Sequence, residues 1–194
     1  MRIALTILVF SLLTINLFAQ EYPEITIRDI QFSPDDSLNY YGGLNTEPSP
    51  NYLGDTVSVT AVVMNPPYEG VNPDSVRTLH AGAPAMYVQD ENNPEWGGIL
   101  VRDTENSTAF SVLDTGLVVK LTGVVGEFFT TTQLNVFGFE ASNITGQTKR
   151  PLPVQLTIDS LTQLGSGLPK YTAEKWEGVY VEFRNLTTSD QGIL

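Results

Sequence analysis

The chain has 194 residues, a formal net charge of −12 at pH 7, no cysteine and a single histidine. A surface this acidic repels phosphate backbones and anionic lipid headgroups, which excludes binding driven by general electrostatic attraction to nucleic acid or membranes. The lack of cysteine excludes disulfides, thiol catalysis and thiol lipidation, and with one histidine it argues against a zinc site.

Residues 1–19 have the layout of a secretory signal peptide. Arg2 precedes a mostly apolar run, and a polar, acidic stretch begins at Glu21. The apolar run is short for a membrane span, contains several polar residues and has no positively charged flank after it. We therefore expect cleavage near Ala19 or Gln20, no membrane span in the mature chain, and a secreted or cell-surface protein of a bacterial envelope.

The mature chain opens with residues 20–51, for which the sequence predicts a strand at residues 24–32 and then a loop rich in proline and glycine. Strict alternation begins at residues 55–64. Apolar side chains share one face there, with serine and threonine on the other, which is typical of a half-buried strand. The inward set is Val57, Val59, Ala61 and Val63.

Four further strands are predicted after a long surface loop at residues 65–84. Residues 85–90 and 98–103 are joined by the turn-rich sequence ENNPEWG, which indicates a hairpin. Residues 117–128 repeat the alternation of the first strand, and residues 130–139 are rich in β-branched and aromatic residues. Short helices are predicted at two places, residues 106–114 and residues 158–164.

Five strands with a short helix between the third and the fourth predict an oligonucleotide/oligosaccharide-binding (OB) barrel at residues 52–144. The alternative, an immunoglobulin-like sandwich, needs about seven regularly spaced strands. Residues 145–194 are expected to form a linker and the start of an incomplete second β-module. The predicted class is thus all-β: a five-stranded OB-like barrel with one short helix, an N-terminal strand and an incomplete second module.

The end of the chain has the composition of a strand, but no partner strands follow it. We expect residues 176–186 to be extended and less closely packed than the barrel, because a lone strand leaves its ladder hydrogen bonds unsatisfied. Downstream domains of the same polypeptide are the expected partners of this segment.

Three stretches resemble OB-like modules of exported bacterial proteins: GDTVSVTAVVMN, AMYVQDENNPEWGGILVRD and LDTGLVVKLTGVVGEFFTTTQL. Such modules accompany secreted endonuclease/exonuclease/phosphatase domains and lamin-tail-like domains. The similarity covers roughly residues 52–139, and AEKWEGVYVEFRNLT is similar to the strand that opens the next module in tandem members. The resemblance implies a barrel in an accessory or binding role, but this chain contains no nuclease domain.

Patterns of common catalytic and metal sites are absent from the sequence. His80 has no nucleophile motif beside it. The acidic loop that begins at Asp90 lacks the spacing of a calcium site, since Pro94 occupies a ligand position. The paired carboxylates Asp35 and Asp36 have no apolar surroundings that would raise a pKa. We therefore expect no catalytic residues, no bound metal and no cofactor.

Ligands of OB barrels meet the second and third strands and the loops around them. That position predicts a ligand-binding face on which aromatic rings stack on sugars or bases. Its residues are Tyr87, Gln89, Trp96, Arg102 and Phe129. The alternative is that the aromatic residues are structural, with Tyr87 and Phe128 in the core and Trp96 covering the hairpin.

These observations predict a non-catalytic exported β-module. It would act as an accessory, spacer or ligand-binding domain of a larger secreted or surface protein, with a glycan or a protein as its ligand. The second hypothesis is a nucleic-acid-binding OB module of an extracellular nuclease. No basic groove accompanies the aromatic residues, so nucleic acid is the less favoured partner.

Overall fold

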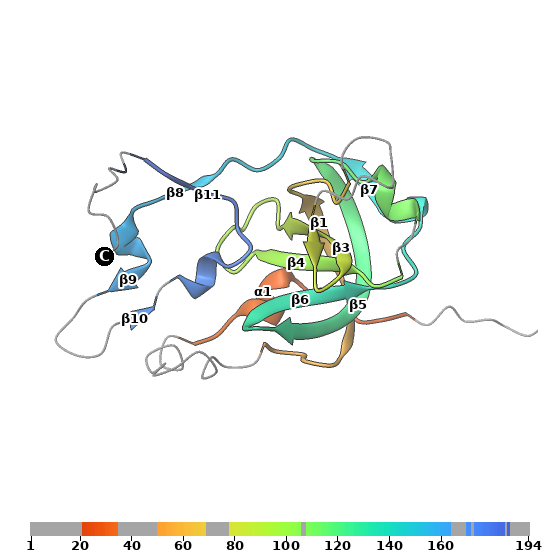
Figure 1. Ribbon diagram of the computed structural model, residues 1–194, viewed down its shortest axis with the longest axis horizontal. Coiled ribbons are helices and arrows are strands. Elements are labelled where there is room, and N and C mark those ends of the chain that lie inside the picture. The colour runs from red at the N-terminus through yellow and green to blue at the C-terminus, as the bar shows by residue number, and fades with distance from the viewer. Residues whose placement is uncertain are drawn as a thin grey trace, which may run out of the picture.

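The computed structural model describes residues 21–34, 50–68, 78–105, 108–163, 170–171, 173–184 and 186. This part of the chain is mainly β-structure with one short α-helix, which confirms the all-β class (Figure 1). The long strands are β1 (Thr56–Val63), β3 (Ala83–Gln89), β4 (Gly98–Asp103), β5 (Leu117–Phe128) and β6 (Thr131–Val136).

The pairings of these long strands return to their starting point. β1 pairs with both β3 and β5, β3 pairs with β4, β4 with β6, and β6 with β5. All these pairs are antiparallel except β4 and β6, which run parallel. Two short strands extend the sheet: β2 (Leu79–His80) pairs with β3, and β7 (Ile144–Gln147) pairs with the start of β5. The linker predicted from residue 145 thus begins inside β7.

The alternation in β1 and β5 places their apolar side chains in one core. Val59 lies directly opposite Leu121 in the antiparallel pair, and both side chains are fully buried. The predicted inward set of β1 is buried as expected, and β4 and β5 have the predicted bounds. The hairpin across ENNPEWG is confirmed by the pairing of Gln89 with Gly98.

The strand predicted at residues 24–32 is wrong. Glu24 makes an isolated bridge to Ser58, but α1 (Ile27–Gln31) is a helix. Thr26 and Asp29 form a capping box, in which each side chain accepts a hydrogen bond from the backbone N–H of the other. That Thr-x-x-Asp signal was present in the sequence and outweighs β propensity, because it satisfies the exposed N–H groups of the first turn.

The segment before α1 covers a polar residue of β1. Ser58 points away from the core, yet it is buried. Its N–H donates to the carbonyl of Pro23 and its carbonyl accepts from the N–H of Ile25, both at 2.9 Å. Its hydroxyl lies 2.8 Å from that of Thr122 on β5. Residues 23–25 therefore extend the sheet locally although they do not form a continuous strand.

The predicted short helices are both shorter than expected. The 3₁₀ helix η2 (Thr108–Val112) lies between β4 and β5, where a helix was predicted, and it buries Phe110 in the core. Its predicted caps at residues 106 and 107 lie outside the described residues. The second is reduced to η4 (Ile158–Ser160), because Thr162 and Gln163 form a short strand that pairs with Lys170 and Tyr171; residue 164 lies outside the described residues.

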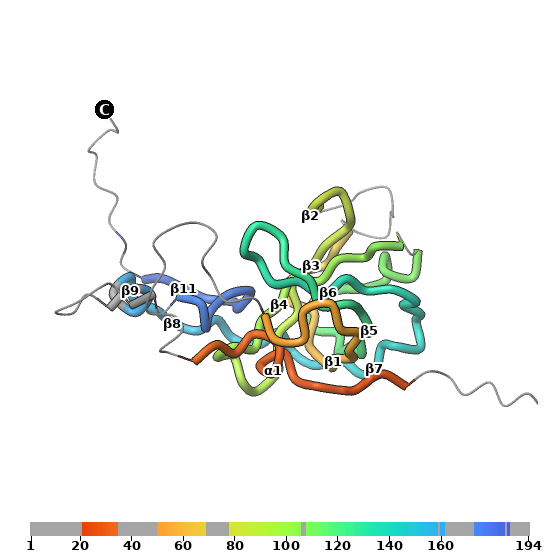
Figure 2. Tube along the Cα trace, turned by 90° about the horizontal axis from the view of Figure 1, so that it is seen from below, coloured from red at the N-terminus to blue at the C-terminus, as the bar shows by residue number. Residues whose placement is uncertain are grey.

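The C-terminal elements lie together on one side of the main sheet, and the two views agree on this (Figures 1 and 2). β8 (Val154–Leu156) pairs in parallel with β11 (Val181–Phe183), and β9 (Thr162–Gln163) pairs with β10 (Lys170–Tyr171). β11 is extended and only partly buried, as expected, but the expectation of a lone strand is wrong, because β8 supplies its ladder partner. Residue 176 ends a 3₁₀ helix instead of belonging to the strand. The remaining short 3₁₀ helices are η3 (Ala141–Asn143) and η5 (Glu174–Trp176).

No helix in the described ranges is long and apolar enough to cross a membrane. Two long loops were predicted from the sequence. Residues 35–49 of the first and residues 69–77 of the second lie outside the described residues.

Candidate ligand-binding face

The outer surface of β3, β4 and β6 carries several of the predicted ligand-binding residues. The register places Tyr87, Leu100 and Gln133 in one row across the three strands. The next row holds Arg102 and Asn135. We call this surface the outer face, because the alternate residues of the same strands fill the core.

One end of the outer face is covered by residues 173–184, which we call the strap. The N–H of Trp96 donates to the carbonyl of Lys175 at 2.8 Å, and the N–H of Tyr180 donates to Oε1 of Gln89 at 2.9 Å. Val179 between these anchors is buried. Gln89 and Trp96, with 1% and 5% of their surfaces exposed, therefore contact the chain itself.

The strap lies against β4 through a close backbone contact between Gly98 and Gly178. A Cβ atom added to Gly98 would lie 2.3 Å from the carbonyl carbon of Gly178, which no side-chain rotation can relieve. Glycine at residue 98 is thus required by the approach of the strap.

Replacing Gly98 with alanine should lift the strap and leave the main sheet folded. A backbone clash of this kind costs about 1–3 kcal/mol, so amide exchange at Trp96 and Tyr180 should accelerate roughly tenfold or more. Hydrogen exchange followed by NMR measures both amides. Gly146→Ala is the matched control, because a Cβ there meets Val118 at an ordinary 3.8 Å. Equal protection in Gly98→Ala and the parent would contradict the contact.

Arg102 positions the β2–β3 turn. Its guanidinium donates to the carbonyls of His80 and Ala81 at 2.9 and 3.0 Å and to Oδ1 of Asn135 at 2.9 Å. Ala81 and Gly82 at the turn both have positive φ, as a tight hairpin turn requires. The donors of this predicted ligand-binding arginine therefore bond to other groups of the protein rather than to a ligand. These hydrogen bonds also fix the position of His80.

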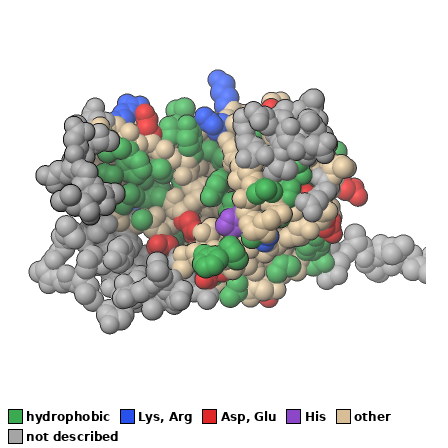
Figure 3. All heavy atoms as spheres, in the orientation of Figure 1, with side chains coloured by type: hydrophobic (Ala, Val, Ile, Leu, Met, Phe, Trp, Pro, Cys, Tyr) green, Lys and Arg blue, Asp and Glu red, His purple; other side chains and the backbone are tan. Residues whose placement is uncertain are grey.

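His80 begins a cluster of aromatic rings at the end of the sheet. Its ring lies 5.4 Å from that of Phe128, which in turn lies 4.6 Å from Phe129, both contacts edge to face. We call these three residues the aromatic tip. Phe129 is 86% exposed. In the space-filling view, hydrophobic side chains gather on both sides of a hollow between the C-terminal elements and the sheet (Figure 3).

The backbone that presents Phe129 is strained. Phe128 pairs with Thr131, so Phe129 and Thr130 alone form the turn between β5 and β6. Both have positive φ, 49° and 66°. Turns of this geometry favour asparagine and glycine, and a bulky residue there costs about 1–2 kcal/mol. A strained, exposed aromatic ring is more typical of a binding residue than of a structural one.

Glu177 of the strap carries a half-buried carboxyl group beside the outer face. Burial raises its pKa from 4.5 to about 7, with further increases from the charges of Glu174 and Glu127; a hydrogen bond from the backbone N–H of Thr132 opposes the shift. Burial and the charge of Glu177 also raise the pKa of the Tyr87 hydroxyl. Glu177 thus exchanges its proton near neutral pH.

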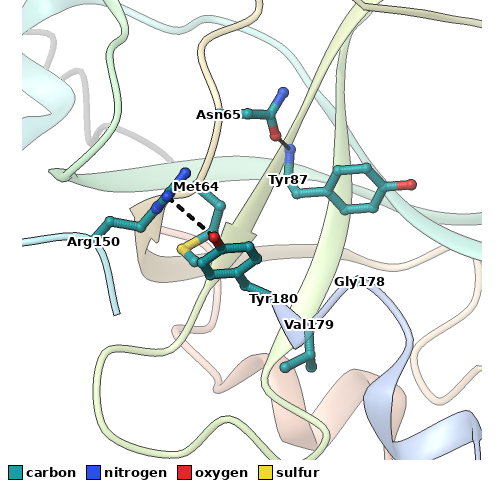
Figure 4. A pocket seen from close by; sticks show the side chains of 7 residues that line it. All are labelled: Met64, Asn65, Tyr87, Arg150, Gly178, Val179 and Tyr180. Atoms are coloured by element: carbon teal, nitrogen blue, oxygen red, sulfur yellow. Dashed lines mark hydrogen bonds between the residues drawn. The ribbon is translucent and has the colours of Figure 1, made fainter. Parts of the chain in front are cut away.

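A pocket of about 390 Å³ is lined on one side by residues 178–180 of the strap (Figure 4). Tyr87 contributes to its rim, and its ring extends away from the pair formed by Arg150 and Tyr180. The guanidinium of Arg150 lies 4.5 Å above the centre of the Tyr180 ring. The other lining residues are Met64, Asn65, Gly178 and Val179.

Sequence reasoning missed Glu177 and Arg150. The environment of each residue is created by the strap, which contacts strands that are distant in the sequence. The residues next to Glu177 and Arg150 in the chain form no motif that would identify either as functional. The pattern around Glu177 was interpreted as a strand motif alone.

The acidic loop after β3 is a turn held by Asp90. Its Oδ1 accepts hydrogen bonds from the N–H groups of Asn92 and Asn93 at 2.9 and 2.8 Å. Among the described residues, no group of three histidine or acidic side chains is placed to hold a metal ion.

Comparison with models of known protein families and with curated proteins finds no match to the chain. The strand pairing and the exposed aromatic residues are therefore the basis of the functional proposal.

Proposed function

We propose that the protein is a non-catalytic exported binding module built on an OB-like barrel, and that it binds an uncharged glycan at the aromatic tip. The barrel is supported by the cyclic pairing of the five long strands and by η2 between the third and the fourth. Gly123 supports it too, because a Cβ there would lie 2.5 Å from the carbonyl oxygen of Asn135, so glycine lets β5 and β6 coil closely.

The exposed, strained Phe129 is the observation that carries the binding role. An aromatic ring presents a flat apolar surface on which the C–H face of a sugar packs, with no need for charge. The net charge of −12 disfavours an anionic ligand over the surface as a whole. Export is supported by the signal-like residues 1–19, and the resemblance implies further domains of the same polypeptide as partners.

Replacing Phe129 with alanine should weaken glycan binding at least tenfold. Stacking on an aromatic ring is worth roughly 1–3 kcal/mol per base in nucleic-acid binders, and we expect a comparable loss. Affinity electrophoresis in gels containing uncharged polysaccharides, such as β-glucan, xylan and galactomannan, measures the retardation of each variant.

Two variants separate binding from folding. Phe129→Gly also removes the ring but relieves the positive φ, so it should lose binding while its melting temperature is unchanged or higher. Leu152→Ala removes another side chain that is 86% exposed and should bind like the parent. Retardation of Phe129→Gly equal to that of the parent would disprove the proposed site.

The nucleic-acid hypothesis is tested with the same protein. The aromatic tip would also stack on bases, so binding of a single-stranded DNA oligonucleotide is measured at 50 and 200 mM salt. Affinity that falls steeply with salt and depends on Phe129 would replace the glycan proposal by the nucleic-acid one.

A further inference from the structure

Within the part of the chain that the structure describes, Arg150 has no carboxylate partner, although the protein is strongly acidic. The described part of the chain contains three ion pairs, and none involves Arg150. Thr148, two residues before Arg150, donates a hydrogen bond from its hydroxyl to Oε1 of Glu91 at 2.8 Å. In a chain with 22 acidic and 10 basic residues, chance would readily supply an acidic neighbour.

The guanidinium of Arg150 is held in place by Tyr180. It lies over the tyrosine ring, and one Nη donates to the tyrosine hydroxyl at 3.3 Å (Figure 4). Stacking fixes the plane of the guanidinium, so less side-chain freedom is lost when its remaining N–H groups bind a ligand. A fixed, planar set of donors suits the two oxygens of a carboxylate.

The pocket beside Arg150 combines this cation with an apolar wall. Met64 and Val179 are both buried and line it. Asn65 is also part of the lining, and its Oδ1 already accepts the N–H of Tyr87 at 2.8 Å, so its amide nitrogen is the group left for a ligand. A volume of about 390 Å³ is suitable for a small molecule.

We propose that this pocket binds a small ligand in which a carboxylate is joined to an apolar body. The carboxylate pairs with the guanidinium of Arg150, and the apolar part packs against Met64 and Val179. This site is separate from the aromatic tip and does not depend on the glycan proposal.

The probe is 3-phenylpropionate, with the uncharged 3-phenylpropanol as its isostere. Titrations followed by ¹H–¹⁵N NMR should shift the amides of residues 178–180 and of Asn65 with the carboxylate and leave those of Phe128 and Phe129 unchanged. The alcohol should bind at least tenfold more weakly. Equal affinity for both probes, or shifts confined to the aromatic tip, would overturn the proposal.

Variants test the role of the arginine. Arg150→Gln should weaken 3-phenylpropionate binding at least tenfold, and Arg150→Lys should weaken it too, since lysine offers no planar set of donors. Lys149→Gln removes the same charge from the neighbouring exposed residue and should bind like the parent. Undiminished binding by Arg150→Gln, or equal losses in Lys149→Gln and Arg150→Gln, would show that no specific carboxylate site exists here.

Discussion

Replacing Val59 with aspartate should prevent the protein from folding. Val59 is fully buried opposite Leu121, in the middle of the core that β1 and β5 share. An aspartate there must either bury an unpaired charge or hold its proton at neutral pH, and either costs several kcal/mol. Because domains are stable by only about 5–15 kcal/mol, we expect no cooperative unfolding transition by circular dichroism.

Two variants show that the effect comes from the buried charge. Val59→Ala removes volume without adding charge and should remain folded, with a lower melting temperature. Val112→Asp introduces the same charge at a side chain that is 53% exposed and should unfold near the parental temperature. A Val59→Asp protein that melts with the parent would mean that the inward face of β1 is wrongly assigned.

The core could be predicted from sequence because it follows from strand periodicity. Val59 and Leu121 belong to long alternating runs, and period-two alternation leaves one arrangement that buries all apolar side chains together. The hairpin between β3 and β4 was equally clear, since ENNPEWG contains the residues that turns favour. α1 was missed because five residues are too few to show helical periodicity, and the capping pair at Thr26 and Asp29 was the remaining local signal.

The candidate site was less predictable because it depends on contacts between distant segments. Gln89 and Trp96 were assigned to a ligand face from their place on the second strand and the following turn. Tyr180 and Lys175 of the strap, more than 75 residues later in the chain, hydrogen-bond to them instead. Phe129, by contrast, lies in a tight turn whose exposure follows from local geometry, and it is exposed as a ligand-binding residue must be.

Replacing Glu177 with glutamine should remove a large part of the pH dependence of stability. The folded protein holds the proton of Glu177 up to about pH 7, whereas the unfolded chain releases it near 4.5. Between these values the folded state binds more protons, so the free energy of unfolding falls as pH rises from about 4.5 to about 7 and then levels off. The raised pKa corresponds to a loss of up to about 3 kcal/mol across this window.

Urea unfolding of the parent and of Glu177→Gln at pH 4.5, 5.5, 6.5 and 7.5 measures this effect as the difference between the two profiles. Glu24 and Asp29, whose pKa values are lowered by hydrogen bonds to Lys120 and Thr26 respectively, contribute in the opposite direction but are common to both proteins and cancel. The difference should favour the glutamine variant increasingly up to pH 7, because glutamine stays uncharged beside Glu174 and Glu127.

Glu174→Gln supplies the control. Removing that neighbouring charge should lower the pKa of Glu177, which is measured from its carboxyl carbon by NMR. The pKa should still stay above 4.5, since burial is the larger cause of the shift. Parallel profiles for the parent and Glu177→Gln would show that the strap does not bury this carboxyl group in solution.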